Sequence, residues 1–365
     1  MVRRSPVSAA PLFAGRAFAA GYYVPDTGTV ARSRGGAVVA RGDDPLAIVY
    51  NPGALSEQRR PQLLLDMSAL RLNLRFERSG VPGDAESGRV AENDPPPQLM
   101  PAIVYTHPLG DRFTGAVGLV APAGPRMKFA KGGPQRFTND ELYLEEATYG
   151  FALAVRAHPL LSVGLYGGAL YTAVTHDFHA TLNGEAPPSE SPANDLPARL
   201  EVKAPFTLTA GAGVKVHLSP EMEMGFSYRP EANLDAGGTL VTGEPSPTDE
   251  DVHFKFNLPA IWRAGARYVQ PSWDVEMDVV WEGWGSHKEE IVDADDGNFA
   301  GTSEEAVVRD FRDAWSFRLG STVQAAKGVQ VHGGAYFETG AVPTRTMDVS
   351  TYDPAKVGLA AGVSV

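Results

Sequence analysis

The chain has 365 residues, of which 43% are hydrophobic and 21% are charged, so it carries enough apolar material to fold. Its formal net charge is −12 with a pI of about 5.2, and its Lys and Arg residues are dispersed, which argues against a nucleic-acid partner. It has no cysteine, which excludes a disulfide framework and thiolate metal sites. With 39 glycines, 29 prolines and no long helical pattern, the sequence predicts an all-β protein.

The first twenty residues resemble a secretory signal peptide. They have a basic start, a short apolar stretch and an Ala-Phe-Ala-Ala end. Arg16 interrupts the apolar part, so a flexible N-terminus is the alternative. No run approaches about 18 apolar residues, so any crossing of a bilayer would be made by strands.

The clearest strand pattern lies at Trp273–Glu282, where Trp273, Val275, Met277, Val279 and Trp281 alternate with Asp274, Glu276, Asp278, Val280 and Glu282. Side chains of a strand point to opposite faces in turn, so one face is apolar with tryptophan at both ends and the other is nearly all carboxylate. A strand of about ten residues fits the height of a bilayer core. A half-buried strand of a soluble sandwich would alternate in the same way.

The same alternation recurs in about twelve segments. In each, the apolar face is expected to point outward to lipid and the polar face into a hydrated lumen. The clearest examples are residues 70–77, 221–229, 251–258, 315–319 and 329–338. The sequence therefore predicts a transmembrane antiparallel β-barrel.

Short and long connections alternate along the chain. Tight turns are expected at 158–159, 218–220, 270–272 and 326–328, and long polar loops at 78–97, 122–141, 177–199, 233–250 and 286–308. Short turns on one rim and long loops on the other are typical of outer-membrane barrels.

Residues 21–58 precede the first strand and resemble the N-terminal plug, or hatch, of the long-chain fatty-acid transporter family of outer membranes. The family hallmark is a glycine-rich stretch, an acidic pair and Tyr-Asn-Pro-Ala, and Gly53 departs from it where alanine is usual. The matching positions are Gly35, Gly36, Asp43, Asp44, Tyr50, Asn51, Pro52 and Gly53.

Further matches follow in order along most of the chain. They lie at 111–124, 258–265, 281–284, 310–320 and 352–354. Family members have fourteen strands, and the last segment here, 358–365, resembles the third strand from the end. We therefore expect a sequence lacking about two strands, with a twelve-stranded variant as the alternative. The expected domains are the candidate signal peptide at 1–20, the hatch at 21–60 and the barrel at 61–365.

The resemblance implies transport of long-chain fatty acids or other hydrophobic compounds by passive diffusion. A ligand would be captured by an apolar groove among the outer loops, pass the plug and leave laterally through the wall. Groove candidates are Met127, Phe129 and Phe137, with ordinary packing as the alternative. Lateral-gate candidates are Gly115, Gly118, Pro122 and Gly124, because glycine and proline weaken strand pairing; tight packing is again the alternative.

Charged residues suggest how the plug and a ligand are held. Asp43 and Asp44 are expected to cap a short helix at 45–49, and Asn51-Pro52 to end it. Arg32, Arg34 and Arg41 are expected to pair with lumen carboxylates. Lys255, Arg263 and Arg318 are candidates for binding a ligand carboxylate, unless they only balance wall acids.

Other functions remain as alternatives. A general diffusion porin would lack the plug, an outer-membrane lipid hydrolase would need a Ser-His pair, and a lectin-like sandwich would be soluble. No metal-ligand spacing, Gly-x-Ser-x-Gly elbow or phosphate-binding loop occurs, so we expect no enzyme, no metal and no cofactor. The expected partners are a hydrophobic small molecule, such as a fatty acid or an aromatic hydrocarbon, and outer-membrane lipid around a monomer.

Overall fold

The computed structural model describes residues 8–9, 26–78, 86–122, 124–181, 194–243, 248–294 and 304–365. The candidate signal peptide at 1–20 lies outside these residues except for β1 (Ser8–Ala9), which pairs with the last strand, and residues 21–25 of the expected hatch also lie outside them. No helix in the described part of the chain is long and apolar enough to cross a membrane.

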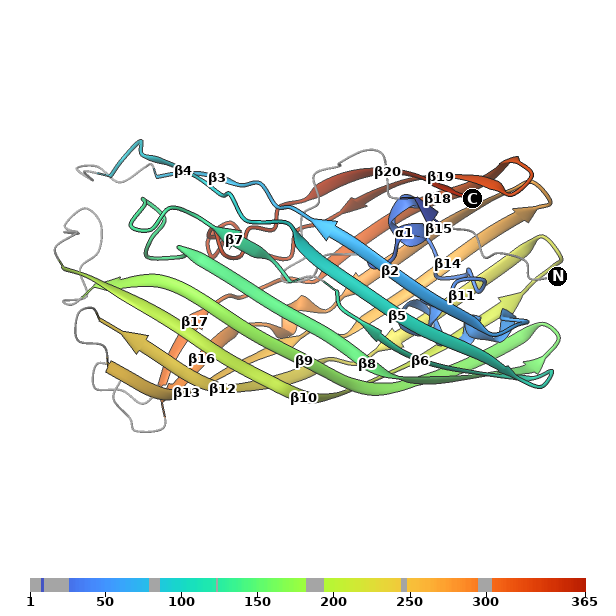
Figure 1. Ribbon diagram of the computed structural model, residues 1–365, viewed down its shortest axis with the longest axis horizontal. Helices are drawn as coiled ribbons and strands as arrows, with labels where there is room; N and C mark the ends of the chain where they lie inside the picture. The colour runs from blue at the N-terminus through green and yellow to red at the C-terminus, as the bar shows by residue number, and fades with distance from the viewer. Residues whose placement is uncertain are drawn as a thin grey trace.

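Twelve long strands, several of them interrupted, form one antiparallel wall in the described residues. Figure 1 shows them running obliquely along the long axis of the molecule. In chain order they are β2 (Gln62–Leu70) continued by β3 (Arg75–Glu77), β4 (Val90–Glu92) continued by β5 (Gln98–Leu109), β6 (Phe113–Val120) with β7 (Arg126–Lys128), β8 (Glu141–His158), β9 (Leu161–Thr181), β10 (Asp195–His217), β11 (Met222–Arg229) with β12 (Ala232–Thr242), β13 (Thr248–Leu258) with β14 (Ile261–Gln270), β15 (Trp273–Glu282) with β16 (Glu289–Ala294), β17 (Glu304–Val308) with β18 (Ala314–Ala326), β19 (Val329–Glu338) and β20 (Lys356–Ser364).

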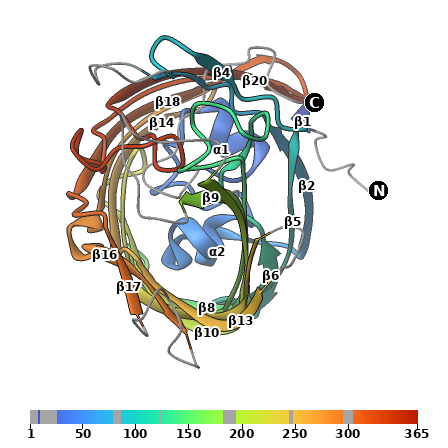
Figure 2. The ribbon, with the colours of Figure 1, turned by 90° about the vertical axis from the view of Figure 1, so that its left-hand side faces the viewer.

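The wall curls into a barrel, seen from its long-loop end in Figure 2. Each strand pairs with the next along the chain, which is the meander expected when tight turns join neighbouring strands. The prediction of an antiparallel β-barrel with about twelve strands in this sequence is confirmed.

In the half of the barrel that carries the short turns, the polar faces of strands such as β15 and β18 point inward. Asp274, Glu276 and Asp278 of β15 are buried, whereas Met277 of the same strand is 67% exposed on the outside. The same arrangement holds in β18, where Arg318 is buried and Phe317 is half exposed. An apolar outer surface and a polar interior are what a barrel in lipid requires.

In the half that carries the long loops, the pattern is reversed. Val252, Phe256 and Leu258 of β13 are buried inside the barrel, and Phe254 packs against the same cluster. The expectation that the apolar face of 251–258 points outward is therefore wrong, and the same holds for 72–76, whose apolar residues pack on that cluster. An alternating pattern defines two faces but does not say which one is inside.

Several strands change face at an irregularity where the two halves meet. The breaks lie at 230–231, 259–260 and 309–313, and β10 has a bulge between Ala204 and Thr207. Proline occupies the first two breaks, where it removes a backbone donor. The bulge inserts one extra residue in β10. Both irregularities change which face of the strand the following side chains occupy.

The half that carries the long loops is called the upper half below. Its strands replace two of the expected loops. Residues 233–250 hold most of β12 and the start of β13, and 286–308 hold β16 and β17. Their glycine, proline and charge content predicted loops, but the inward-facing apolar side chains stabilise them as strands.

Residues 26–58, named here the inner segment, lie inside the barrel (Figure 2). The segment contains α1 (Thr29–Ser33), α2 (Ala47–Tyr50) and the 3₁₀ helix η1 (Pro52–Glu57). Its apolar side chains pack with inward-facing residues of β5, β6 and β8, among them Val104, Ala116 and Ala152. The part of the chain predicted to be a hatch is thus enclosed by the wall.

Glycines on the inner face of the wall allow the backbone of the inner segment to approach closely. A Cβ added at Gly320 would lie 2.6 Å from Arg34 O, and one added at Gly334 would overlap the backbone of Arg34 itself. A Cβ at Gly213 would lie 2.8 Å from Pro52 Cδ. Any larger residue at these positions would push the inner segment away from the wall.

Replacing Gly334 by valine should therefore displace the inner segment, at a cost of about 1–3 kcal/mol for overpacking. Gly333→Val is the matched control, because a Cβ there would have its nearest neighbour, Ser321 Oγ, at 3.8 Å. We expect higher ion conductance in planar bilayers for Gly334→Val than for Gly333→Val. Equal conductance of the two variants would contradict the claim that the inner segment packs directly against Gly334.

Candidate functional site

Buried charges of the wall strand β15 hold the inner segment. Arg34 Nη2 lies 2.8 Å from Asp274 Oδ1 and 3.4 Å from Glu276 Oε2, and its guanidinium also donates to the hydroxyl of Thr322. Arg41 donates to the same hydroxyl at 3.2 Å, and its Nη1 lies 3.9 Å from Asp274 Oδ2. The expected pairing of the segment's arginines with lumen carboxylates is thus close for Arg34 and looser for Arg41. Arg32 instead donates to Asp26 O within the segment at 2.8 Å.

The backbone of the inner segment is bound by the same row of carboxylates. The N–H groups of Val38 and Val39 donate to Asp278 Oδ2 at 2.7 and 3.0 Å, and that of Ala40 donates to Glu276 Oε1 at 2.6 Å. Peptide groups that no helix or sheet satisfies therefore have charged acceptors. The acidic face of β15 is a docking surface for the segment as well as a polar lining.

The acidic pair of the predicted hatch has two different roles. Asp43 accepts from Arg41 at 2.5 and 2.9 Å. Asp44 Oδ1 accepts from Leu46 N at 2.8 Å, just before α2, and burial raises the pKa of Asp44 to about 6. Asp44 thus makes a turn that leads into the helix.

Asn51 joins the inner segment to the wall. Its Nδ2 donates to Val39 O at 2.8 Å and to Val214 O of β10 at 3.0 Å, while its Oδ1 accepts from Gly53 N at 3.1 Å and so caps η1. A Cβ at Gly53 would lie 2.6 Å from Gly213 O. Glycine therefore stands where the resembling family has alanine, because the backbone of β10 occupies the space of a side chain.

The remaining hatch residues shape the fold of the segment. Tyr50 Oη accepts from Thr27 N at 2.8 Å and donates to Thr27 O at 2.9 Å, which closes the segment into a loop. Gly35 and Gly36 have φ values of 62° and 80°, a conformation that glycine adopts at no steric cost. The glycine-rich stretch thus makes the turn that follows α1.

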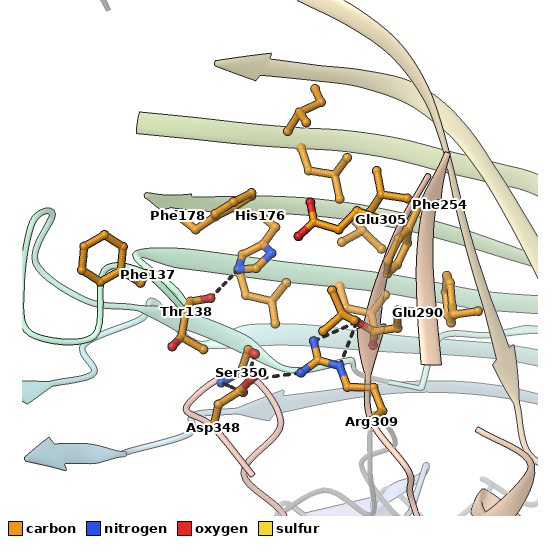
Figure 3. A pocket seen from close by; sticks show the side chains of 18 residues that line it. Phe137, Thr138, His176, Phe178, Phe254, Glu290, Glu305, Arg309, Asp348 and Ser350 are labelled. Carbon is orange, nitrogen blue, oxygen red and sulfur yellow. Dashed lines mark hydrogen bonds and ion pairs between the residues drawn. The ribbon is translucent and has the colours of Figure 1, made fainter. Parts of the chain in front are cut away.

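An apolar cavity of about 280 Å³, named here the outer chamber, lies in the upper half of the barrel. It is enclosed by β8, β9, β10, β12, β13, β16 and β17 together with the segments around Phe137 and Ser350 (Figure 3). Its lining is Phe137, Thr138, Leu142, Leu144, Val174, His176, Phe178, Leu200, Leu240, Phe254, Phe256, Glu290, Val292, Glu305, Val307, Arg309, Asp348 and Ser350. The inward-facing apolar side chains of the upper strands thus form an apolar cavity.

One side of the outer chamber is polar, with one cation, Arg309, among the carboxylates Glu290, Glu305 and Asp348 (Figure 3). Arg309 donates to Glu290 Oε2 at 2.7 and 2.9 Å and to Asp348 Oδ2 at 3.0 Å. His176 Nε2 lies 2.9 Å from Thr138 O. A buried charge is tolerated only when it is paired, and the guanidinium here has carboxylates on two sides.

The groove candidates are only partly brought together. Phe137 lines the outer chamber, whereas Met127 and Phe129 are buried in the hydrophobic cluster beside it and do not line it. Sequence reasoning missed the lining strands, notably Phe254 and Phe256. The alternation at 251–258 was the available signal, but its apolar face was assigned to lipid.

A second cavity of about 90 Å³, named here the lower cavity, lies between the inner segment and the wall. Tyr50 and Pro52 line it from the inner segment, and Pro122 and Arg263 line it from the wall. The Arg263 guanidinium lies 5.9 Å from the centre of the Tyr50 ring, a cation–π arrangement. Of the three candidates for binding a carboxylate, Arg263 is the one that lines either of these two cavities.

The other two candidate cations are engaged elsewhere. Lys255 lies on the outer face of β13, where its Nζ is 2.9 Å from Asp293 Oδ2, so it does not face the lumen as expected. Arg318 does face the lumen, and it pairs with Asp26 of the inner segment and with Glu338 Oε2 at 3.7 Å.

The lateral-gate candidates divide into two pairs. Gly115 and Gly118 lie within β6 and are paired with both β5 and β8 without interruption. Pro122 and Gly124 lie between β6 and β7, where the wall strand is interrupted. Since Pro122 also lines the lower cavity, the interruption and the cavity adjoin.

Residues 10–364 match the family model described as outer membrane protein transport protein (OMPP1/FadL/TodX). The chain belongs to this family. A long-chain fatty acid transport protein of Escherichia coli O6:H1 (strain CFT073) is 21% identical over 355 residues, which cover 89% of this chain and 78% of that protein.

Solved structures agree with the fold of an OMPP1/FadL/TodX barrel. The Pseudomonas aeruginosa FadL homologue has a TM-score of 0.78 at 16% identity, covering 94% of this chain and 87% of that one. The Ralstonia pickettii toluene transporter TbuX has a TM-score of 0.69 at 15% identity, covering 93% and 97%. Like other members of its family, this chain is an outer-membrane protein.

A Ser-His contact of the kind that a hydrolase needs occurs deep in this OMPP1/FadL/TodX barrel. His332 Nε2 lies 2.7 Å from Ser364 Oγ, but its Nδ1 faces the hydroxyl of Thr322 at 3.0 Å and not a carboxylate. That hydroxyl accepts from Arg34 and Arg41. A triad orients its histidine with an acid, so this contact is not arranged for nucleophilic catalysis.

One cluster has the ligand types of a metal site: Glu57, His217 and Glu223. Lys215 Nζ lies between its carboxylates, 2.6 Å from Glu57 Oε1 and 3.0 Å from Glu223 Oε2. The lysine already supplies the positive charge and links η1 to the wall strands β10 and β11.

Arg309→Met should destabilise the polar side of the outer chamber, because it leaves Glu290 buried without its cation; the expected loss in free energy of unfolding is about 3–5 kcal/mol. Hydrogen exchange should rise most at 346–351. Arg345→Met is the control, since its side chain is 62% exposed and a surface ion pair contributes at most about 1 kcal/mol. A loss no greater than that of the control would refute the assigned role.

Proposed function

We propose that this protein is a channel for hydrophobic small molecules, either long-chain fatty acids or aromatic hydrocarbons, across the outer membrane. The carrying observation is the outer chamber, an apolar cavity at the long-loop end of a barrel whose lower lumen is filled by the inner segment. An alkyl chain gains about 0.8 kcal/mol for each CH₂ removed from water, so an apolar chamber takes up such molecules without an energy source.

The inner segment acts as a plug. It occupies the lumen below the outer chamber, and ion pairs and hydrogen bonds to β15 keep it there. The contacts to β15 are polar and can be exchanged for water, and the segment also gives up apolar packing against β5, β6 and β8 when it shifts. Neither change requires the wall to unfold. Passage is by diffusion down a concentration gradient.

The ligand then leaves laterally. The lower cavity adjoins both the plug, at Tyr50 and Pro52, and the interrupted wall strand, at Pro122. Irregular backbone is tolerated at membrane depth only where it lines a cavity or protein, which fits an exit at this interruption. Pro122 and Gly124 are thus the gate residues that we retain.

The proposed ligand class rests on the lining of the two cavities and on the names of the relatives. The E. coli relative is named a long-chain fatty acid transport protein and TbuX a toluene transporter. The largely apolar lining of the outer chamber suits the uncharged part of either ligand. Arg263, in the lower cavity, is the residue that we assign to a carboxylate head group when one is present.

The apolar outer surface of the wall indicates membrane lipid as the second partner. Leu65, Met67, Phe151, Leu165 and Leu208 are each more than 60% exposed on the lipid-facing wall. So large an apolar band is stable only in a bilayer, and membrane lipid surrounds a single barrel.

Phe254→Ala should weaken binding of a fluorescent dodecanoic acid analogue to the purified protein by about tenfold, equivalent to about 1.4 kcal/mol, because an aromatic wall of the outer chamber is lost. Lys255→Ala, on the opposite face of the same strand, is the control. Unchanged binding in Phe254→Ala would place the ligand elsewhere.

A disulfide between the plug and the wall should stop transport if the plug must shift. Thr29→Cys combined with Asp66→Cys is suited to this, because the two side chains are in contact between α1 and β2, with Thr29 Oγ1 2.6 Å from Asp66 Oδ2, and the chain has no other cysteine. Cellular uptake of the dodecanoic acid analogue should fall under oxidising conditions and recover after reduction. Equal uptake in both states would exclude plug movement.

Conductance separates this function from a general porin. We expect the wild-type protein in planar bilayers to conduct ions poorly, because the plug fills the lumen. A large, constant conductance together with no uptake of the hydrophobic probe would favour the porin.

A further inference from the structure

The wall also has an unpaired stretch between β10 and the strand made of β11 and β12. β10 pairs with β11 from Ala212↔Tyr228 toward the short turns and with β12 from Lys203↔Gly237 toward the long loops. Between these two ladders, residues 204–211 have no pairing with residues 229–236. We name this unpaired stretch the β10–β11 opening.

The opening is a local separation of two strands that otherwise fit together. The ladders on its two sides are in the same register, so the strands part and rejoin without slipping. Pro230 lacks an N–H to donate across the opening. On the other side, Pro205 and Phe206 lie in the bulge of β10, and Pro205 O accepts from Tyr149 Oη of β8 at 3.2 Å, away from β12.

The lower cavity reaches this part of the wall from inside. Ser227 and Arg229 line it from the inner face, and Ala210, Ala212 and Tyr228 line it although their side chains lie on the exposed outer face. The lower cavity thus touches the residues that flank the opening, 209–212 of β10 and 227–229 of β11. The β10–β11 opening therefore adjoins the lower cavity.

The opening begins at the level of an aromatic belt. Tyr228 pairs with Trp262, and Trp262 packs against Trp281 and Trp315 on the outer surface, with ring centroids 6.2 and 5.3 Å apart. Tryptophan and tyrosine gather at the membrane interface of barrels. On the β10 side of the opening, Phe206 and Leu208 are 65% and 75% exposed and offer an apolar edge.

Unpaired peptide groups are costly in hydrocarbon and are tolerated where they border water, protein or a ligand, as they can at the interface where this opening begins. We propose that the β10–β11 opening is a second lateral portal, through which the apolar part of a ligand passes between the lower cavity and the surrounding lipid. It acts beside the interruption at Pro122. This inference rests on the proposed function and adds a separate route to it.

The test closes the opening in a chain that has no native cysteine. The variant Ala210→Cys with Pro230→Cys extends the register of Ala212↔Tyr228 into the opening, and a short bismaleimide joins the two thiols. The matched control is Glu201→Cys with Thr239→Cys, a directly paired position of the same two wall strands. Uptake of the fluorescent dodecanoic acid analogue is measured in Gram-negative cells that lack their own channel.

We expect the crosslink in the opening to lower uptake by about half or more, as for one of two parallel exits, and the control crosslink to leave it unchanged. Unchanged uptake at verified crosslinking, or an equal fall in the control, would overturn the portal. If the pair in the opening does not crosslink, a bulky maleimide on Ala210→Cys alone, compared with one on Glu201→Cys, gives the same comparison. Absence of uptake by the wild-type protein would instead refute the proposed function itself.

Discussion

The whole structure depends on the requirement that a backbone in lipid must satisfy its hydrogen bonds internally, which antiparallel pairing between neighbouring strands achieves. Several strands also continue beyond the half that carries the short turns into the half that carries the long loops. Such a strand must then turn its apolar residues from the outside to the inside. Breaks at 230–231 and 259–260 and the bulge of β10 are where several strands make this change.

That reversal creates the candidate site. Inward apolar side chains of the upper strands, such as Leu200, Leu240 and Phe256, surround the outer chamber. Below it, inward carboxylates of β15 bind the inner segment. The apolar outer chamber above the carboxylates that bind the inner segment thus follows from a change of pattern along several strands.

The fold and the enclosed segment could be predicted, because alternation over ten residues and the motif at 50–53 are local signals. Asp274, Glu276 and Asp278 face inward as their spacing indicated. The site could be predicted only in part. Phe137 lines the outer chamber, but Met127 and Phe129 pack beside it. Lys255 lies on the outer face of β13. It was predicted to face the lumen because the faces of β13 were assigned as in the membrane half.

The sequence by itself determined that its strands alternate with a period of two and so have two unlike faces. The alternating short and long connections and the family resemblance added the prediction of a barrel around a glycine-rich leading segment. Only the tertiary structure decided which surface faces inward at each height, since a period-two pattern is unchanged when a strand is turned over. It also decided which wall glycines receive the backbone of the inner segment and where two strands part, because both depend on residues far apart in the chain.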